Sequence, residues 1–247
     1  MWDAREKWYI EQMTAPAMMN RNAVRFGHWP FQQWKTGPGQ VKSITYADGW
    51  LIMKELSCGL LSLGLQKGDR GAVMCHTCPE WVWADYSILC AAGITVCIYP
   101  TLSENEMRYI INDSGARILY LNDESNLSKV IGSWPQMPEL QKVIVMKEDY
   151  ISSDERVLSL GDLRKMGVAY LAKDRMAFEQ RWRSVSMTDY MTIVYTSGTT
   201  GIPKGAVHTH LTFNSAICRD LKDTPNFNQG DKVLSFLPLS HTYEREC

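Results

Sequence analysis

Short apolar runs alternate with amphipathic stretches along residues 46–146. Between the runs, apolar residues such as Ile52, Leu56 and Leu60 recur at the spacing of one face of a helix. The runs themselves are almost continuously apolar, which is typical of strands that are buried on both faces. The chain is therefore predicted to be an α/β protein with a mostly parallel sheet flanked by helices. The predicted strands are 71–75, 95–99, 117–121 and 142–146.

Local signals set the bounds of several helices. Gly64 follows the amphipathic stretch 46–63 at the position where a left-handed residue often ends a helix. Ser103 and Glu106 have the spacing of a capping box, and the helix that they start should end near Gly115. Further helices are predicted from Pro79, over 124–131 and over 163–182, with a polar loop over 149–162.

The first 40 residues are rich in aromatic residues and contain the breakers Trp29-Pro30 and Gly37-Pro38-Gly39. We therefore expect residues 1–40 to form an irregular segment ahead of a domain that occupies 41–247. A second strand-rich region begins near Thr192.

A run of hydroxyl side chains, glycines and one lysine follows this point, with the makings of a phosphate-binding loop. Its glycines let backbone amides turn toward an anion, its hydroxyls add donors, and Lys204 supplies a positive charge. Predicted strands at 192–195 and 205–207 flank it. It is not a Walker A loop, because Pro203 stands where that motif needs glycine. The candidate ligands of a phosphate group are Thr196, Ser197, Gly198, Thr199, Thr200, Gly201 and Lys204.

The same run resembles the phosphate loop of the adenylate-forming (AMP-binding) superfamily, whose signature Ser-Gly-Thr-Thr-Gly-x-Pro-Lys-Gly it matches without a gap. That superfamily includes acyl-CoA synthetases, luciferases and peptide-synthetase adenylation domains. The resemblance implies their fold, and a reaction in which a carboxylate and ATP give an acyl-adenylate and pyrophosphate. The loop would stabilise the β- and γ-phosphates, where negative charge develops. A surface turn without a ligand, with Lys204 merely facing solvent, is the alternative.

Other stretches are most similar to long-chain fatty acid–CoA ligases. The run 237–245, Leu-Pro-Leu-Ser-His-Thr-Tyr-Glu-Arg, resembles the core motif that follows the phosphate loop in these enzymes. The resemblance makes His241 a catalytic residue that lies against the acyl carboxylate and the α-phosphate and donates a hydrogen bond there. A structural histidine in a turn is the alternative. Glu244 and Arg245 match the family pattern too, without an assigned role.

The resemblance extends over only part of the family's catalytic machinery. A magnesium-binding Glu, a ribose-binding Asp and a catalytic Lys of the family would lie beyond Cys247. We therefore expect residues 41–247 to be a partial adenylation domain of a ligase that uses a fatty acid, ATP, Mg²⁺ and CoA, and we expect little activity from this N-terminal fragment alone. A non-enzymatic nucleotide- or phosphate-binding fragment, a regulatory fragment and a ligase for a different carboxylate stay open as alternatives.

Composition and charge exclude several functions. A formal net charge of −1 and the lack of a long basic run give no electrostatic basis for binding nucleic acid. The longest apolar stretch, 88–99, is too short to span a bilayer. We predict a cytoplasmic protein and leave peripheral membrane contact open. Cys75 and Cys78 have the spacing of a metal or redox half-site, but no second pair accompanies them, so structural thiols are predicted.

Overall fold

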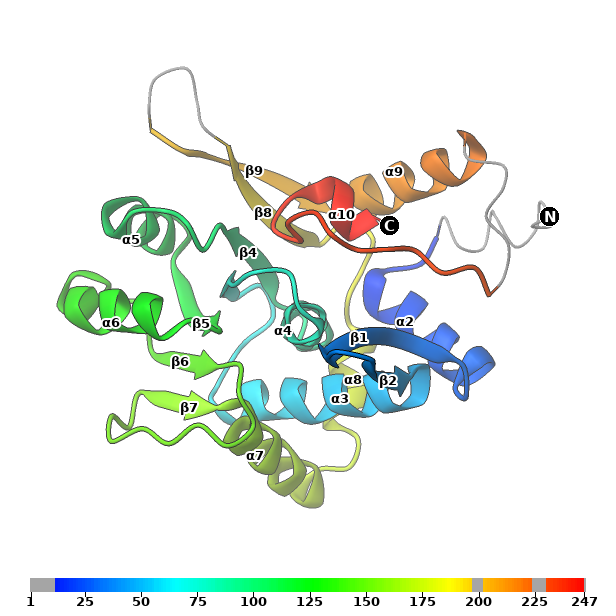
Figure 1. The fold of residues 1–247 in the computed structure, drawn as a ribbon, viewed down its shortest axis with the longest axis horizontal. Coiled ribbons are helices and arrows are strands. Elements are labelled where there is room, and N and C mark those ends of the chain that lie inside the picture. Colours follow the sequence, from blue (N-terminus) through cyan, green and yellow to red (C-terminus); the bar gives the residue numbers. More distant parts are fainter. Residues whose placement is uncertain (1–11, 197–201, 224–229, 247) are drawn as a thin grey trace.

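A computed structural model describes residues 12–196, 202–223 and 230–246 of the chain. Seven strands form one sheet in the order β7-β6-β5-β3-β4-β8-β9 (Figure 1). Neighbouring strands are parallel except for β8 and β9, which are antiparallel. The predicted fold class is therefore confirmed. The strands are β3 (Arg70–Met74), β4 (Ile94–Ile98), β5 (Ala116–Leu121), β6 (Lys142–Val145), β7 (Val157–Ser159), β8 (Tyr190–Thr196) and β9 (Lys204–Thr209).

Helices cover both faces of this sheet. One hydrophobic core joins alternate strand residues, such as Val73 and Tyr120, to α3, α4 and α7. The second core joins the intervening residues, such as Met74 and Leu119, to α5 and α6 (Figure 1). Burial on both faces explains why the strand sequences are continuously apolar. The helices are α3 (Tyr46–Ser62), α4 (Pro79–Cys90), α5 (Glu104–Ser114), α6 (Glu124–Ser133) and α7 (Leu160–Lys173), with a short 3-10 helix, η1 (Trp134–Gln136).

The predicted caps are present. Gly64 has a φ of 87°, and its N–H donates to the carbonyl of Leu61 while the N–H of Leu65 donates to that of Leu60, which is the Schellman pattern. Ser103 and Glu106 form the reciprocal capping box of α5. These local signals fix where α3 ends and where α5 begins.

Two predicted boundaries differ from the structure. The helix expected over 163–182 is broken into α7 and α8 (Ala177–Arg183), because the Asp174 carboxylate accepts from the N–H of Met176 and its backbone is extended. The loop expected over 149–162 contains β7 and the start of α7. Ser159 caps α7 by accepting from the N–H of Asp162, which places the helix start earlier than the apolar pattern suggested.

The expectation of an irregular N-terminal segment is wrong for its described part. It contains α2 (Ala15–Phe26), and β1 (Pro30–Gly37) pairs with β2 (Gln40–Thr45) as a separate hairpin. The predicted breakers mark the bounds of these elements instead of preventing them: Pro30 begins β1, and Gly39, with a φ of 71°, forms the hairpin turn. The other helices of the described residues are α9 (His210–Asp223) and α10 (Thr242–Glu246).

Candidate functional site

The carboxyl ends of three adjacent parallel strands, β3, β4 and β8, meet at one edge of the sheet. Met74 pairs with Ile98 where β3 and β4 end, and Cys97 pairs with Val194, so β8 continues past the paired part of β4. In open α/β sheets, ligands bind outside the carboxyl ends of the strands. This edge is therefore where a site is expected.

The predicted phosphate loop begins and ends at this edge. Thr196 is the last residue of β8, Lys204 is the first of β9, and the two are direct partners across the antiparallel pair. Both residues are exposed. The strands predicted on either side of the loop are confirmed. The other candidate phosphate ligands, Ser197, Gly198, Thr199, Thr200 and Gly201, lie outside the described residues, so their contacts with phosphate stay a prediction.

The strand before the loop is braced by a buried tyrosine. The hydroxyl of Tyr195 donates to the Asp113 carboxylate of α5 at 2.6 Å. Burial and this carboxylate raise the pKa of Tyr195, so the phenol stays neutral. Across the hairpin, a Cβ on Gly205 would lie 2.8 Å from Cγ2 of Ile193 and 3.1 Å from the Tyr195 ring. Gly205 therefore allows β9 to pack closely against the strand that leads to the loop.

A second segment, residues 237–241, is held at the same edge. The hydroxyl of Thr77, which follows β3, donates to the carbonyl of Leu237 at 2.7 Å and accepts from the N–H of Leu239 at 3.2 Å. The Ser240 hydroxyl donates to the carbonyl of Ile98, the last residue of β4, at 3.4 Å. These contacts place the exposed residue His241 beside the end of β4, the strand next to β8. The sheet edge thus brings together Thr196, Lys204 and the segment that carries His241.

Sequence reasoning missed the arginine that anchors this segment to α4. The side chain of Arg245 is buried, and one of its terminal nitrogens donates to both carboxylate oxygens of Asp85 on α4, at 2.7 and 2.9 Å. Glu244 is also buried, and its carboxylate accepts from the N–H of Phe236 at 3.0 Å. A signal was present in the sequence, because Asp85 lies among apolar residues in the middle of the helix 79–90, and a buried carboxylate there requires a partner.

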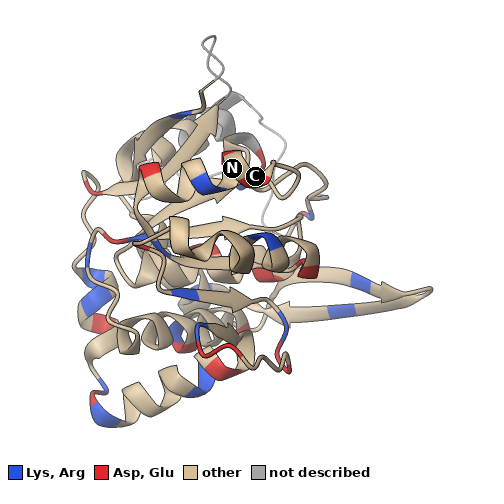
Figure 2. Ribbon diagram, turned by 90° about the vertical axis from the view of Figure 1, so that its left-hand side faces the viewer, with Lys and Arg blue, Asp and Glu red and all other residues tan. Residues whose placement is uncertain are grey.

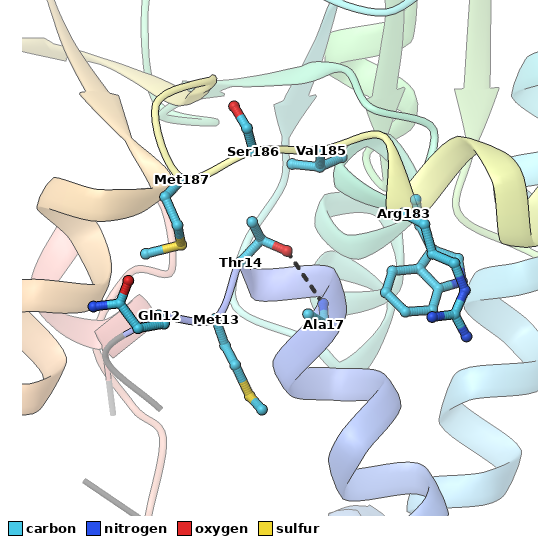
Figure 3. Close-up of a pocket in the computed structure, with 9 residues that line it drawn as sticks. Gln12, Met13, Thr14, Ala17, Arg183, Val185, Ser186 and Met187 are labelled. Carbon is cyan, nitrogen blue, oxygen red and sulfur yellow. Dashed lines mark hydrogen bonds between the residues drawn. The ribbon is translucent and has the colours of Figure 1, made fainter. Parts of the chain in front are cut away.

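The structure also contains an open pocket of about 490 Å³ elsewhere (Figure 3). It lies between the start of α2 and the stretch that follows α8, and Thr14, Ala17, Ser186 and Met187 are among its lining residues. Ser186 and Met187 precede β8, whereas the phosphate loop follows it. The pocket therefore lies toward the amino end of β8, and it contains none of the predicted site residues.

Burial decides whether Cys75 is a reactive thiol. Cys75 is buried, and desolvation raises the pKa of its thiol, which makes it a poor nucleophile.

Within the described ranges, no group of three or more His, Cys, Asp or Glu side chains could hold a metal ion. The helices of that same part of the chain include none that is long and apolar enough to cross a membrane. Figure 2 shows basic and acidic residues interspersed over the visible face.

Comparisons with known proteins identify the family of this chain. The sequence model of the AMP-binding enzyme family matches residues 15–247. The long-chain-fatty-acid–CoA ligase ACSBG2 of Rattus norvegicus is 28% identical over 235 residues, which is 93% of this chain and 34% of that protein. The long-chain-fatty-acid–CoA ligase FadD15 of Mycobacterium bovis is 30% identical over 82% of this chain and 32% of its own length. The chain thus spans about a third of the length of these relatives.

Solved structures show the same fold. A long-chain-fatty-acid–CoA ligase from Archaeoglobus fulgidus superposes with a TM-score of 0.75 at 19% identity, over 95% of this chain and 44% of that one. A red-emitting luciferase from Phrixothrix hirtus gives a TM-score of 0.74 at 17% identity, again over 95% and 44%. Because proteins with such different names share the fold, the fold alone does not select a substrate. The match of the family model over 15–247 shows that this chain belongs to the AMP-binding enzyme family.

Proposed function

We propose that this chain carries the phosphate-binding part of an AMP-forming long-chain fatty acid–CoA ligase. The observation that carries the proposal is the meeting of two segments at one sheet edge. The Thr196–Lys204 hairpin and the segment with His241 both lie at the carboxyl ends of adjacent parallel strands. The names of the relatives with 28–30% identity favour a fatty acid as the carboxylate.

The reaction needs charge stabilisation at two places. In the first step a carboxylate oxygen forms a bond to the α-phosphorus of ATP, and the bond to the bridging oxygen of pyrophosphate breaks. In the second step the CoA sulfur forms a bond to the acyl carbon and AMP leaves. The first step concentrates negative charge on the departing pyrophosphate, and donors that are already in position lower its barrier.

The residues at the sheet edge fit this demand. Lys204 and the hydroxyl of Thr196 are exposed at adjacent positions where the loop begins and ends. In the proposal they bind the β- and γ-phosphates together with Ser197, Gly198, Thr199, Thr200 and Gly201. His241 donates a hydrogen bond to an oxygen of the α-phosphate or of the acyl carboxylate as charge moves between them.

The family resemblance implies Mg²⁺ as a cofactor of the reaction. The described residues contain no group of acidic or imidazole side chains that fits a metal ion. No step is therefore assigned to Mg²⁺ on the residues of this chain.

The experiment that tests the proposal joins residues 1–247 in frame to the C-terminal part of FadD15. The chimera is incubated with ATP, CoA and palmitate, and acyl-CoA, AMP and pyrophosphate are quantified by chromatography. We expect the three products in equal amounts, with acetate and benzoate as weak substrates. The same products from benzoate at a higher rate would identify a ligase for a different carboxylate.

Two further samples separate the remaining alternatives. Residues 1–247 alone are titrated with ATP in a calorimeter, and the chimera is assayed without CoA. A nucleotide-binding fragment without catalytic function predicts binding of ATP but no pyrophosphate release by the chimera. A regulatory fragment predicts neither.

A further inference from the structure

Arg245 is the most enclosed charged side chain near the site. Its side chain is 2% exposed, and that of its partner Asp85 is 6% exposed. The guanidinium lies between two aromatic rings, with its central carbon 5.3 Å from the centroids of both Trp81 and Phe213. Burial alone lowers the pKa of Arg245, but Asp85 and Cys97 raise it above its usual value, so the cation persists in this enclosure.

The guanidinium joins three elements. One terminal nitrogen donates to both carboxylate oxygens of Asp85 on α4. The other donates to the hydroxyl of Thr192 on β8 at 2.7 Å and to the sulfur of Cys97 on β4 at 3.4 Å. The Thr192 hydroxyl in turn donates a hydrogen bond to the carbonyl of Thr95 on β4 at 2.8 Å. The bond to β4 therefore orients the Thr192 hydroxyl so that its oxygen accepts from Arg245.

These contacts connect the two halves of the site. Thr192 lies on β8, four residues before Thr196, where the phosphate loop begins. Arg245 lies on α10, four residues after His241, which is about one helical turn. The Thr77 hydroxyl fixes the other end of the same segment, at Leu237 and Leu239.

We propose that Arg245 is a positioning residue, which sets the location of His241 relative to Thr196, at the carboxyl end of β8, by bonding to Asp85 and Thr192 at once. This inference rests on the proposed function, since it assigns His241 and the loop to one reaction. An arginine is suited to the task because its planar fork fixes direction as well as charge. Stability alone does not explain the choice, because apolar residues often replace a buried ion pair without loss.

Two substitutions separate positioning from folding. Arg245→Lys keeps the positive charge but loses the fork that reaches Asp85 and Thr192 together. Thr192→Val keeps the ion pair and nearly the same volume, and removes only the hydroxyl that links it to β8. The matched control is Arg164→Met, which breaks the pairs of Arg164 with Glu55 and Glu148, next to β6 and β7 at the opposite end of the strand order from β8.

The first measurement is palmitate-dependent exchange of pyrophosphate into ATP by the chimera with the FadD15 C-terminal part. We expect kcat to fall at least 10-fold in Arg245→Lys and at least 3-fold in Thr192→Val, while KM for ATP changes less than 3-fold. Arg164→Met should keep the kcat of the parent. Parental kcat in a folded Thr192→Val variant overturns the proposal, and this variant decides the matter if Arg245→Lys fails to fold.

The second measurement does not depend on activity. Amide hydrogen exchange in residues 1–247 is followed by mass spectrometry in peptides that cover 237–246. We expect exchange there to be faster by at least 5-fold in Thr192→Val and in Arg245→Lys, and unchanged in Arg164→Met. If the chimera does not exchange pyrophosphate into ATP, the proposed function fails. The amide hydrogen exchange measurement still tests whether Arg245 and Thr192 hold residues 237–246 in place. Unchanged protection of the amides of residues 237–246 from hydrogen exchange in both variants overturns the positioning role of Arg245.

Discussion

At the scale of single residues, exposure separates two roles. Lys204 is exposed at the start of β9, where an ammonium group can meet a ligand without rearrangement. Arg245 and His210 are buried and act on the framework instead. A substitution at Lys204 should therefore change the reaction and leave the fold intact, whereas a substitution at His210 should change stability.

Lys204→Ala tests the first role. The lysine charge matters more as pyrophosphate departs than when ATP binds, so the substitution should lower the rate of adenylation at least ~10-fold, with a smaller loss of ATP affinity. Pyrophosphate exchange by the chimera and calorimetric titration measure the two effects. Lys147→Ala is the control, because Lys147 is exposed and forms a surface ion pair with Glu124. Equal behaviour of the two variants would remove Lys204 from the site.

His210 should make stability depend on pH. Its Nδ1 accepts from the N–H of Ala15, and burial lowers its pKa from 6.5 to about 4. As the pH falls, the unfolded chain therefore protonates this histidine before the native state does. The stabilisation from the neutral histidine is complete above pH 6.5 and is lost as the pH falls toward 4.

The loss can be measured by urea denaturation at pH 7 and pH 5. Wild-type protein should lose about 2 kcal/mol of unfolding free energy from this histidine between these values. In His210→Asn the amide oxygen can still accept from Ala15 but does not titrate, so most of this loss should disappear. A wild-type curve parallel to that of His210→Asn would show that His210 takes up its proton over the same pH range in the native and the unfolded states.

At the scale of elements, the packing of α3 on α7 depends on glycine. A Cβ on Gly167 would lie 1.8 Å from the carbonyl oxygen of Glu55, and a Cβ on Gly59 would lie 2.3 Å from that of Leu163. The two helices therefore touch through their backbones. This contact seats α7 over one face of the sheet that presents the site.

Gly167→Ala should separate these helices. We expect a loss of about 1–3 kcal/mol of unfolding free energy, since overpacking forces the backbone to move. Gly132→Ala is the matched control on α6, because nothing lies within 4 Å of the added Cβ. There the better helix propensity of alanine should raise stability by up to about 1 kcal/mol. Both free energies come from urea titrations, and a Gly167→Ala protein as stable as the parent would contradict the close contact.

The sequence predicted elements well where the signal was local. The capping box at Ser103 and the turn at Gly64 need only neighbouring residues, and the apolar strands need only burial on both faces. It failed where a single side-chain bond competes with periodicity, as at Asp174. It also gave no role to Arg245, because Asp85 lies 160 residues away and only folding brings the two together.

At the scale of the whole molecule, exposed apolar side chains lie on two segments that belong to the site, β9 and the residues just before Leu237. Leu234 is 79% exposed, Phe236 is 72% exposed, and Val207 on β9 is also exposed. β9 is the edge strand of the sheet, with no neighbour beyond it among the described residues. Exposed apolar groups next to an open sheet edge favour association with another chain.

Residues 1–247 alone should therefore self-associate and show negligible acyl-CoA formation, since the catalytic groups act together. Light scattering and a thioester assay measure the two properties. Leu234→Glu with Phe236→Glu should reduce the apparent mass of the associated species, whereas Ile151→Glu, at another exposed apolar position, should not. A monodisperse, active 247-residue chain would contradict both expectations.

The central claim is that the phosphates of ATP bind at the carboxyl edge of β8, and labelling of lysines tests it most directly. An acyl-phosphate derivative of ATP transfers its acyl group to amines beside the terminal phosphate, and peptide mass spectrometry then identifies the modified lysines in the chimera. We predict that Lys204 is the first lysine labelled among residues 1–247, and that excess ATP protects it while excess AMP does not. Labelling spread over exposed lysines such as Lys147 and Lys165, with no protection of Lys204 by ATP, would contradict the claim.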